Sequence, residues 1–155
     1  MVFGSSRRAR RRARSGPAEE GTQRTRTVAR VLLGAGLVFA GTGHLTFARD
    51  EFQAQVPEFV PLDADTTVLA SGVVEIGLGA ALVAARRHRV AVGRIAALFF
   101  VAVFPGNLSQ WINHRDGFGL DTDTKRFVRL LFQPLLVAWA LWATSRRGLG
   151  GRKRR

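Results

Sequence analysis

Four long apolar segments follow one another along the middle of the chain, separated by short polar stretches. They run from Val31 to Ala48, from Thr66 to Ala85, from about Val90 to Gln110 and from about Phe127 to Thr144. Each is close to the roughly 20 residues that an α-helix needs to cross about 30 Å of hydrocarbon. Their apolar residues surround the helix axis and do not alternate with period two. The pattern predicts an all-α protein, an integral membrane four-helix bundle.

Basic segments without apolar periodicity flank this region. Residues 1–26 include six arginines between positions 7 and 14. Such a run repels itself and has no core to join, so it predicts a disordered basic tail. Residues 146–155 predict a second basic tail. The expected organisation is therefore a tail over 1–26, a four-span membrane domain over 27–145 and a tail over 146–155.

The charge distribution predicts the orientation of the bundle. The 155 residues carry 24 Lys and Arg against 11 Asp and Glu. Eighteen of the basic residues lie in the N-terminal segment up to Arg30, the loop 86–89 and the C-terminal tail, five lie on the other side, and Arg94 is left, near the side with eighteen. Because basic residues concentrate on the cytoplasmic side, both termini are expected to be cytoplasmic, with the protein in the inner (plasma) membrane.

The basic tails also bear on partners. Orientation and attraction to anionic headgroups explain them, so the expected partner is the lipid bilayer. Nucleic acid is not expected, because no aromatic platform accompanies the arginines. The chain has no cysteine, which excludes disulfides, thiolate metal sites and thiol redox chemistry within it.

The loop between the third and fourth segments is polar. Its candidate ligands match no specific metal-binding pattern, so no metal site is predicted; they are Asn113, His114, Asp116, Asp121 and Asp123. Residues 121–124 instead offer N-caps to the fourth helix.

Ionisable residues inside a span are costly and call for a reason. Glu75 stands nine residues beyond Thr66, about 13 Å into the membrane. Ser71, Glu75 and Gly79 recur every four residues, and Gly36, Ala40 and His44 repeat that spacing. Both sets predict seams of small residues along which helices approach closely.

The other intramembrane polar residues lie at a similar depth. Pro105 frees the carbonyl of Val101 and bends the helix, and Asn107, two residues later, can satisfy the broken backbone groups. Arg129 and Gln133 are one turn apart in the last segment. The predicted ligand-binding site opens outward and consists of His44, Ser71, Glu75, Asn107, Arg129 and Gln133. The alternative is that Glu75 pairs with His44 or Arg129 only to hold the bundle together.

The outer loop 49–65 contains Pro57 and Pro61, so it cannot form one regular helix. Its apolar residues predict a segment that either lies on the membrane surface or folds over the polar site as a lid.

Several short motifs, taken in order, resemble the DoxX and DoxX-like family of small bacterial membrane proteins. The resemblance covers about residues 30–145, with Leu45 and Gly106 where the family usually has Phe and Ala. The motifs are Gly41-Thr-Gly-His44-Leu-Thr-Phe47, Val56-Pro57 with Pro61, Ser71-Gly72-Val-Val-Glu75-Ile-Gly77-Leu-Gly79, and Phe104-Pro105-Gly106-Asn107. The resemblance to this family implies a four-helix membrane protein associated with redox complexes, sulfur metabolism and quinone.

Two functions follow as hypotheses. In the first, the protein is a redox-associated membrane subunit in which His44, Glu75 and Asn107 bind a quinone headgroup, and Glu75 or His44 moves protons as the candidate catalytic residue. The sequence has no motif for electron entry, so a redox partner protein would supply electrons. In the second, it is a non-catalytic small-molecule carrier or membrane scaffold.

Overall fold

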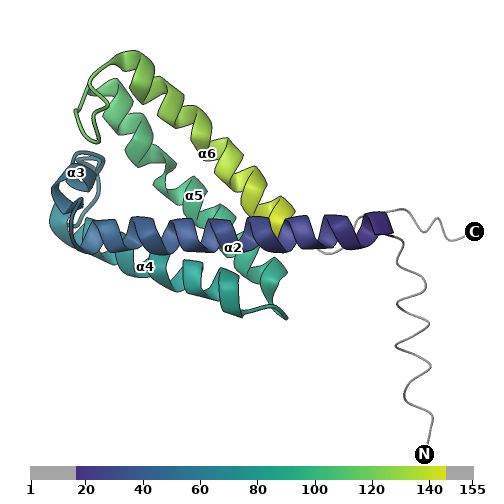
Figure 1. The fold of residues 1–155 in the computed structure, drawn as a ribbon. Coiled ribbons are helices and arrows are strands. Elements are labelled where there is room, and N and C mark those ends of the chain that lie inside the picture. Colours follow the sequence, from purple (N-terminus) through teal and green to yellow (C-terminus); the bar gives the residue numbers. More distant parts are fainter. Residues whose placement is uncertain (1–16, 146–155) are drawn as a thin grey trace, which may run out of the picture.

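The computed structural model describes residues 17–145, and all of the regular structure in this range is helical. The elements are α2 (Pro17–Leu45), α3 (Arg49–Gln53), α4 (Ala64–Ala84), α5 (Arg89–Ile112) and α6 (Asp123–Thr144), shown in Figure 1. The predicted all-α class is confirmed.

The four long helices are membrane-spanning candidates by length and composition. The qualifying stretches are Glu20–Leu45, Ala64–Ala84, Arg89–Ile112 and Asp123–Thr144. Large apolar side chains on their surfaces point away from the bundle; Phe39, Leu98 and Leu135 are 69%, 68% and 62% exposed. Water would penalise so much exposed apolar surface, whereas a bilayer accommodates it. The chain is therefore a multi-pass membrane protein.

The first helix differs at both ends from the sequence prediction. It begins at Pro17, inside the segment assigned to the disordered tail, and Pro is favoured at a first helical position. It ends at Leu45, before the predicted limit of Ala48, because the chain turns and the amide of Ala48 bonds to the carbonyl of Gly43 at 3.0 Å. The predicted tail residues 1–16 and 146–155 lie outside the described part of the chain.

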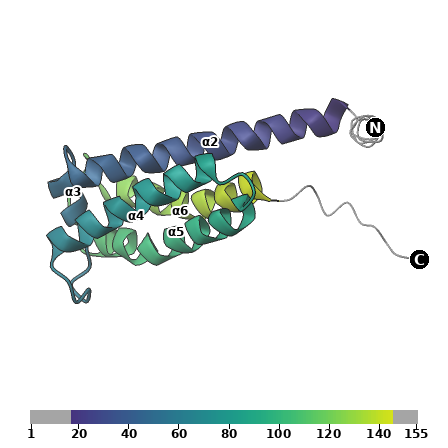
Figure 2. The same cartoon turned by 90° about the horizontal axis from the view of Figure 1, so that it is seen from below.

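The long helices form two antiparallel pairs, α2 with α4 and α5 with α6 (Figures 1 and 2). The pairs come together near the end where α6 finishes and diverge toward α3. The hydrophobic core joins the pairs and consists of Leu33, Leu37, Leu82, Ala96, Ala97, Phe100 and Ala140. This divergence leaves room between the pairs at the α3 end of the bundle.

Two glycines on each helix bring α2 against α4. A Cβ on Gly79 would lie 2.5 Å from the carbonyl oxygen of Gly34, and a Cβ on Gly41 would lie 2.5 Å from that of Gly72. On each helix the two glycines are seven residues apart, a step that returns to within about 20° of the same face. The backbones can approach this closely only because no side chain intervenes.

The predicted small-residue seam on α2 is wrong at Gly36. Gly36 is exposed and would have no atom within 4 Å of an added Cβ, so it lies outside the helix contact, whereas the Cβ of His44 would lie 2.7 Å from a Cβ on Gly72 of α4. From Gly36 to His44 the helix makes two full turns and about 80° more, so these two residues do not lie on the same face. In the other predicted seam, that of Ser71, Glu75 and Gly79, Gly79 lies in the contact between α2 and α4.

The connections at the α3 end are held by capping and ion pairs. The side chain of Thr122 accepts a bond from the amide of Lys125 at 3.3 Å, which confirms the predicted N-cap of α6. Asp63 caps α4 by accepting from the amide of Thr66 at 2.8 Å, and this hydrogen bond lowers the pKa of Asp63.

The acidic residues of loop 113–123 are paired with basic partners. Asp121 contacts Lys125 at 2.6 Å, Asp123 contacts His114 at 2.7 Å, and Asp116 pairs with the buried Arg126. The bond from Lys125 lowers the pKa of Asp121. These carboxylates therefore serve to hold the loop to the start of α6.

Candidate functional site

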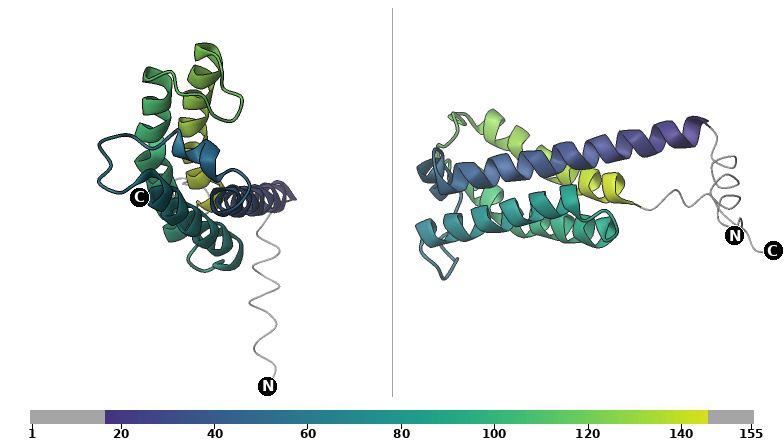
Figure 3. Two further views of the ribbon diagram at one scale, coloured as in Figure 1. Left: turned by 90° about the vertical axis from the view of Figure 1, so that its left-hand side faces the viewer. Right: turned by 60° about the horizontal axis from the view of Figure 1, so that its bottom comes forward.

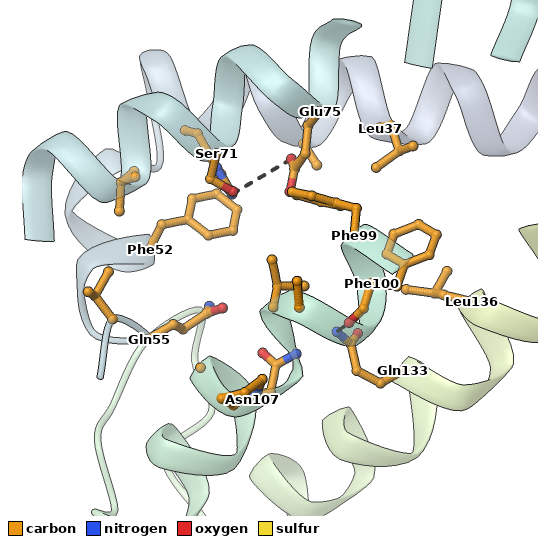
Figure 4. A pocket seen from close by; sticks show the side chains of 18 of the residues that line it. Leu37, Phe52, Gln55, Ser71, Glu75, Phe99, Phe100, Asn107, Gln133 and Leu136 are labelled. Carbon is orange, nitrogen blue, oxygen red and sulfur yellow. Dashed lines mark hydrogen bonds and ion pairs between the residues drawn. The ribbon is translucent and has the colours of Figure 1, made fainter. Parts of the chain in front are cut away.

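A cavity of about 640 Å³ lies between the two helix pairs, toward the α3 end of the bundle. All four long helices and the segment after α3 line it, and most of the lining is apolar. Figure 4 shows a ring of aromatic and aliphatic side chains, with polar groups on opposite walls. Apolar pockets with a few convergent polar groups are typical of small-molecule sites.

All six residues of the predicted ligand-binding set line this one cavity. Ser71 and Glu75 lie on the α4 side, and Asn107 and Gln133 lie opposite them (Figure 4). His44 from α2 and Arg129 from α6 complete the set. Their common depth in four antiparallel spans brings them together. That they bind a ligand stays a prediction.

One wall of the cavity holds a buried His–Glu pair. His44 Nε2 lies 3.8 Å from Glu75 Oε2, and the two side chains are only 7% and 11% exposed. The distance is too long for a hydrogen bond, and Glu75 Oε2 has no hydrogen-bond partner among the described residues. Phe52 of α3 packs edge-on against the His44 ring, with 3.5 Å between the centroids.

Arg129 organises the opposite wall. Its Nε donates to Asn107 Oδ1 at 3.0 Å, and one terminal nitrogen donates to Gln55 Oε1 at 2.9 Å. Its guanidinium also lies over the ring of Phe118, 5.2 Å from the centroid. Within the described residues Arg129 forms no ion pair with Glu75, so of the two alternative pairings for Glu75 the structure contains the one with His44.

The expectation that Asn107 satisfies the backbone groups broken at Pro105 is wrong. Its side-chain oxygen accepts from Arg129, and its side-chain nitrogen donates to no carbonyl among the described residues. A neighbouring carbonyl, that of Phe100, accepts from Gln133 Nε2 at 2.9 Å. Backbone support near Pro105 therefore comes from the paired helix α6, which sequence spacing along α5 could not reveal.

The segment after α3 folds over the cavity as a lid, one of the two alternatives for loop 49–65. Figure 3 shows α3 and this segment across the end of the bundle. The lining residues from the lid are Gln55, Val56, Pro57, Phe59 and Val60. Arg115 anchors the lid by donating to the carbonyl of Val56 at 3.0 Å and to Glu58 at 2.7 Å.

A second anchor fixes the base of the lid. Arg49 forms a two-pronged ion pair with Asp65 at the start of α4, which raises the pKa of Arg49. Gln53 also donates to Asp65, at 3.0 Å. These bonds place α3 against α4, and so hold Phe52 above His44.

Sequence reasoning missed Gln55 as a site residue. Gln55 joins Arg129 from the lid, and its Nε2 is buried without a partner among the described residues. Buried polar groups are nearly always hydrogen-bonded, so Gln55 Nε2 and Glu75 Oε2 are available to a bound molecule. Only the apolar composition of loop 49–65 hinted at a lid, and nothing in it singled out Gln55.

Comparison with known proteins assigns a family but no activity. No curated protein and no solved structure shows a significant match. One family model, described as a domain of unknown function (DUF8561), matches residues 33–144. This description does not name DoxX, so the resemblance to DoxX stays a hypothesis. The match spans most of the four-helix bundle and the whole of the cavity's lid, and the chain belongs to the DUF8561 family.

Proposed function

We propose that the protein binds a lipophilic small molecule with a polar headgroup, most simply a quinone, as a redox-associated membrane subunit. The observation that carries this proposal is the cavity of about 640 Å³ whose apolar lining is interrupted by polar groups on both walls. Its volume is that of a drug-sized ligand site. The resemblance of its lining motifs to DoxX adds support.

The donors and acceptors in the cavity suit a quinone head. The oxidised head has two carbonyl acceptors, and Gln55 Nε2 and the guanidinium of Arg129 are donors at the lid and the α6 wall. The reduced head has two hydroxyl donors, and Glu75 Oε2 is a free acceptor on the opposite wall. Apolar side chains such as Phe99 and Leu136 would surround the ring and the tail.

Glu75 and His44 are placed to hold and move a proton. They are adjacent, buried and on one wall of the cavity, where a carboxyl group and an imidazole can exchange a proton through small movements or one water. A bound quinone would supply two-electron, two-proton redox chemistry. The electrons would come from a partner protein, since the sequence has no motif for electron entry.

The alternative function is a small-molecule carrier or membrane scaffold. The lid and the two prolines within helices, Pro105 and Pro134, favour the carrier. A cavity that is covered at one end and bounded by kink-prone helices can exchange a molecule by movement of one helix pair. A carrier and a redox subunit would share the binding site and differ in whether the bound molecule changes its redox state.

Tryptophan fluorescence tests occupancy of this cavity. Of Trp111, Trp139 and Trp142, Trp139 alone lines it. Titration of the detergent-purified protein with a short-chain ubiquinone should quench its fluorescence, and Trp139→Phe should remove most of that saturable quenching. The matched control Trp142→Phe, one turn further along α6, should keep it. Saturable quenching that survives Trp139→Phe and disappears with Trp142→Phe would place the quinone elsewhere.

We also propose that both termini are cytoplasmic and that the membrane is the inner (plasma) membrane. The start of α2 and the end of α6 lie at the same end of the bundle (Figure 1), as four spans require, and this end carries the greater number of basic residues. Epitope tags at either terminus should be reached by antibody only after the cytoplasmic side is opened. A tag accessible from outside intact cells, at either end, would contradict this orientation.

A further inference from the structure

A second cavity, of about 280 Å³, lies at the other end of the bundle, where the first half of α2 and the end of α6 meet the loop between α4 and α5. Four arginines dominate its lining, and no acidic residue contributes to it within the described part of the chain. The lining residues are Gln23, Arg26, Thr27, Arg30, Arg86, Arg89, Ala143 and Ser145. This cavity is separate from the site between the helix pairs and shares none of its residues.

The positive charge here is not neutralised by the protein. Within residues 17–145, none of the four arginines forms an ion pair with a carboxylate. Arg30 is 4% exposed and donates to the carbonyls of Leu82 and Val83 at the end of α4. Arg86 and Arg89 lie near enough to repel its guanidinium. Gathering like charges around a buried cation is unfavourable unless an anion compensates.

Three of the arginines keep donors free for such an anion. Arg26 Nε is buried and has no partner among the described residues, while its guanidinium lies 5.8 Å from the ring centre of Trp142. No hydrogen bond from the side chains of Arg86 or Arg89 is formed within the described chain. Arg30 is already engaged at α4, so it fixes the floor of the cavity and the other three supply the contacts.

We propose that this arginine cavity binds a phosphate group. Guanidinium groups match phosphate oxygens in paired hydrogen bonds, and a phosphate group can face several of them at once. The cavity lies where the spans end, at the depth of lipid headgroups. The phosphate is therefore carried either by an anionic phospholipid in the bilayer or by a free phosphate ion, and both present the same chemistry to the arginines.

Membrane orientation alone does not account for this arrangement. Arg87 and Arg94 lie at the same end of the bundle, are exposed, and stay outside the cavity. Either residue satisfies the preference for basic residues on this side without lying in the cavity beside the buried Arg30. The clustering of Arg26, Arg86 and Arg89 around Arg30 is the additional feature that a bound anion explains.

The test compares two double variants of the full chain purified in a neutral detergent. Arg86→Gln/Arg89→Gln removes two of the contacts, and Arg87→Gln/Arg94→Gln removes the same charge from outside the cavity. Native mass spectrometry would measure binding of short-chain phosphatidylglycerol, with short-chain phosphatidylcholine as the neutral lipid, and isothermal calorimetry would measure inorganic phosphate. The cavity variant should bind phosphatidylglycerol roughly 30-fold more weakly than wild type.

The two variants distinguish a site for a lipid headgroup from a site for a free phosphate ion, and both from no phosphate site. Loss of phosphatidylglycerol binding in the cavity variant, with the control variant unchanged, assigns the cavity to a lipid headgroup. The same loss for inorganic phosphate without lipid binding assigns it to a free ion. Equal binding by wild type and the cavity variant, or equal losses in the two variants, would overturn the proposal. Size-exclusion and circular dichroism profiles like those of wild type establish that the variants are folded.

Discussion

Gly79→Ala is expected to destabilise the bundle by about 1–3 kcal/mol, even though alanine is the better helix former by about 1 kcal/mol. The new Cβ would lie 2.5 Å from the carbonyl oxygen of Gly34 and 2.9 Å from the amide nitrogen of Val38. Both are backbone atoms and cannot rotate away, so α4 would have to move off α2. Thermal unfolding in detergent, followed by circular dichroism, measures the loss.

Gly77→Ala is the matched control on the same helix. An added Cβ there would meet no atom within 4 Å, and the position is exposed. This variant should be as stable as wild type, or more stable by up to about 1 kcal/mol. If the two variants have the same midpoint, the close packing of α2 on α4 through glycine is wrong.

Glu75→Leu is expected to weaken binding of the reduced quinone, measured with a short-chain ubiquinol, by about 10- to 100-fold, the effect of losing one hydrogen bond to a charged group. Glu75 Oε2 is the free acceptor on its wall of the cavity, and leucine removes it while preserving most of the volume. Glu75→Gln keeps an acceptor and should lose less. Titration by tryptophan quenching gives the three affinities, and Glu20→Gln, an exposed residue of α2 that does not line the cavity, is the control that should match wild type.

Stability of the same variant separates a binding role from a structural one. Glu75 makes no hydrogen bond through Oε2, and His44 Nε2 is 3.8 Å away. If the pair served only to hold helices together, breaking it would cost about 3–5 kcal/mol. We expect Glu75→Leu to unfold at or above the wild-type midpoint, because a buried polar group with no hydrogen bond is removed. A large destabilisation without loss of affinity would favour the structural role.

The sequence predicts the helices and the gathering of polar residues well, for a physical reason. Length and hydropathy determine where a chain crosses a membrane, and depth along antiparallel spans determines which residues lie at the same level. His44, Glu75 and Asn107 therefore meet although they belong to three helices. Depth does not determine which way a side chain points, so the partner of Asn107 could not be read from α5 alone.

The direction in which residues face around the helix axis also explains why the small-residue contact on α2 was predicted incorrectly. The i, i+4, i+8 spacing of Gly36, Ala40 and His44 drifts around the helix, whereas Gly34 and Gly41 stay on one face. Both patterns exist in α2, and only the position of α4 distinguishes them. Gln55 was missed for a related reason, since the path of an irregular loop depends on anchors such as Arg115, far away in sequence.

The most direct measurement is mass spectrometry of the small molecules that co-purify with the protein in mild detergent, for wild type and Glu75→Leu side by side. We expect a quinone with the wild type, at a level well above that in an empty-detergent control, and much less with the variant. A folded wild-type protein that carries no quinone, and fails to take one up when quinone is added, would contradict quinone binding in this cavity.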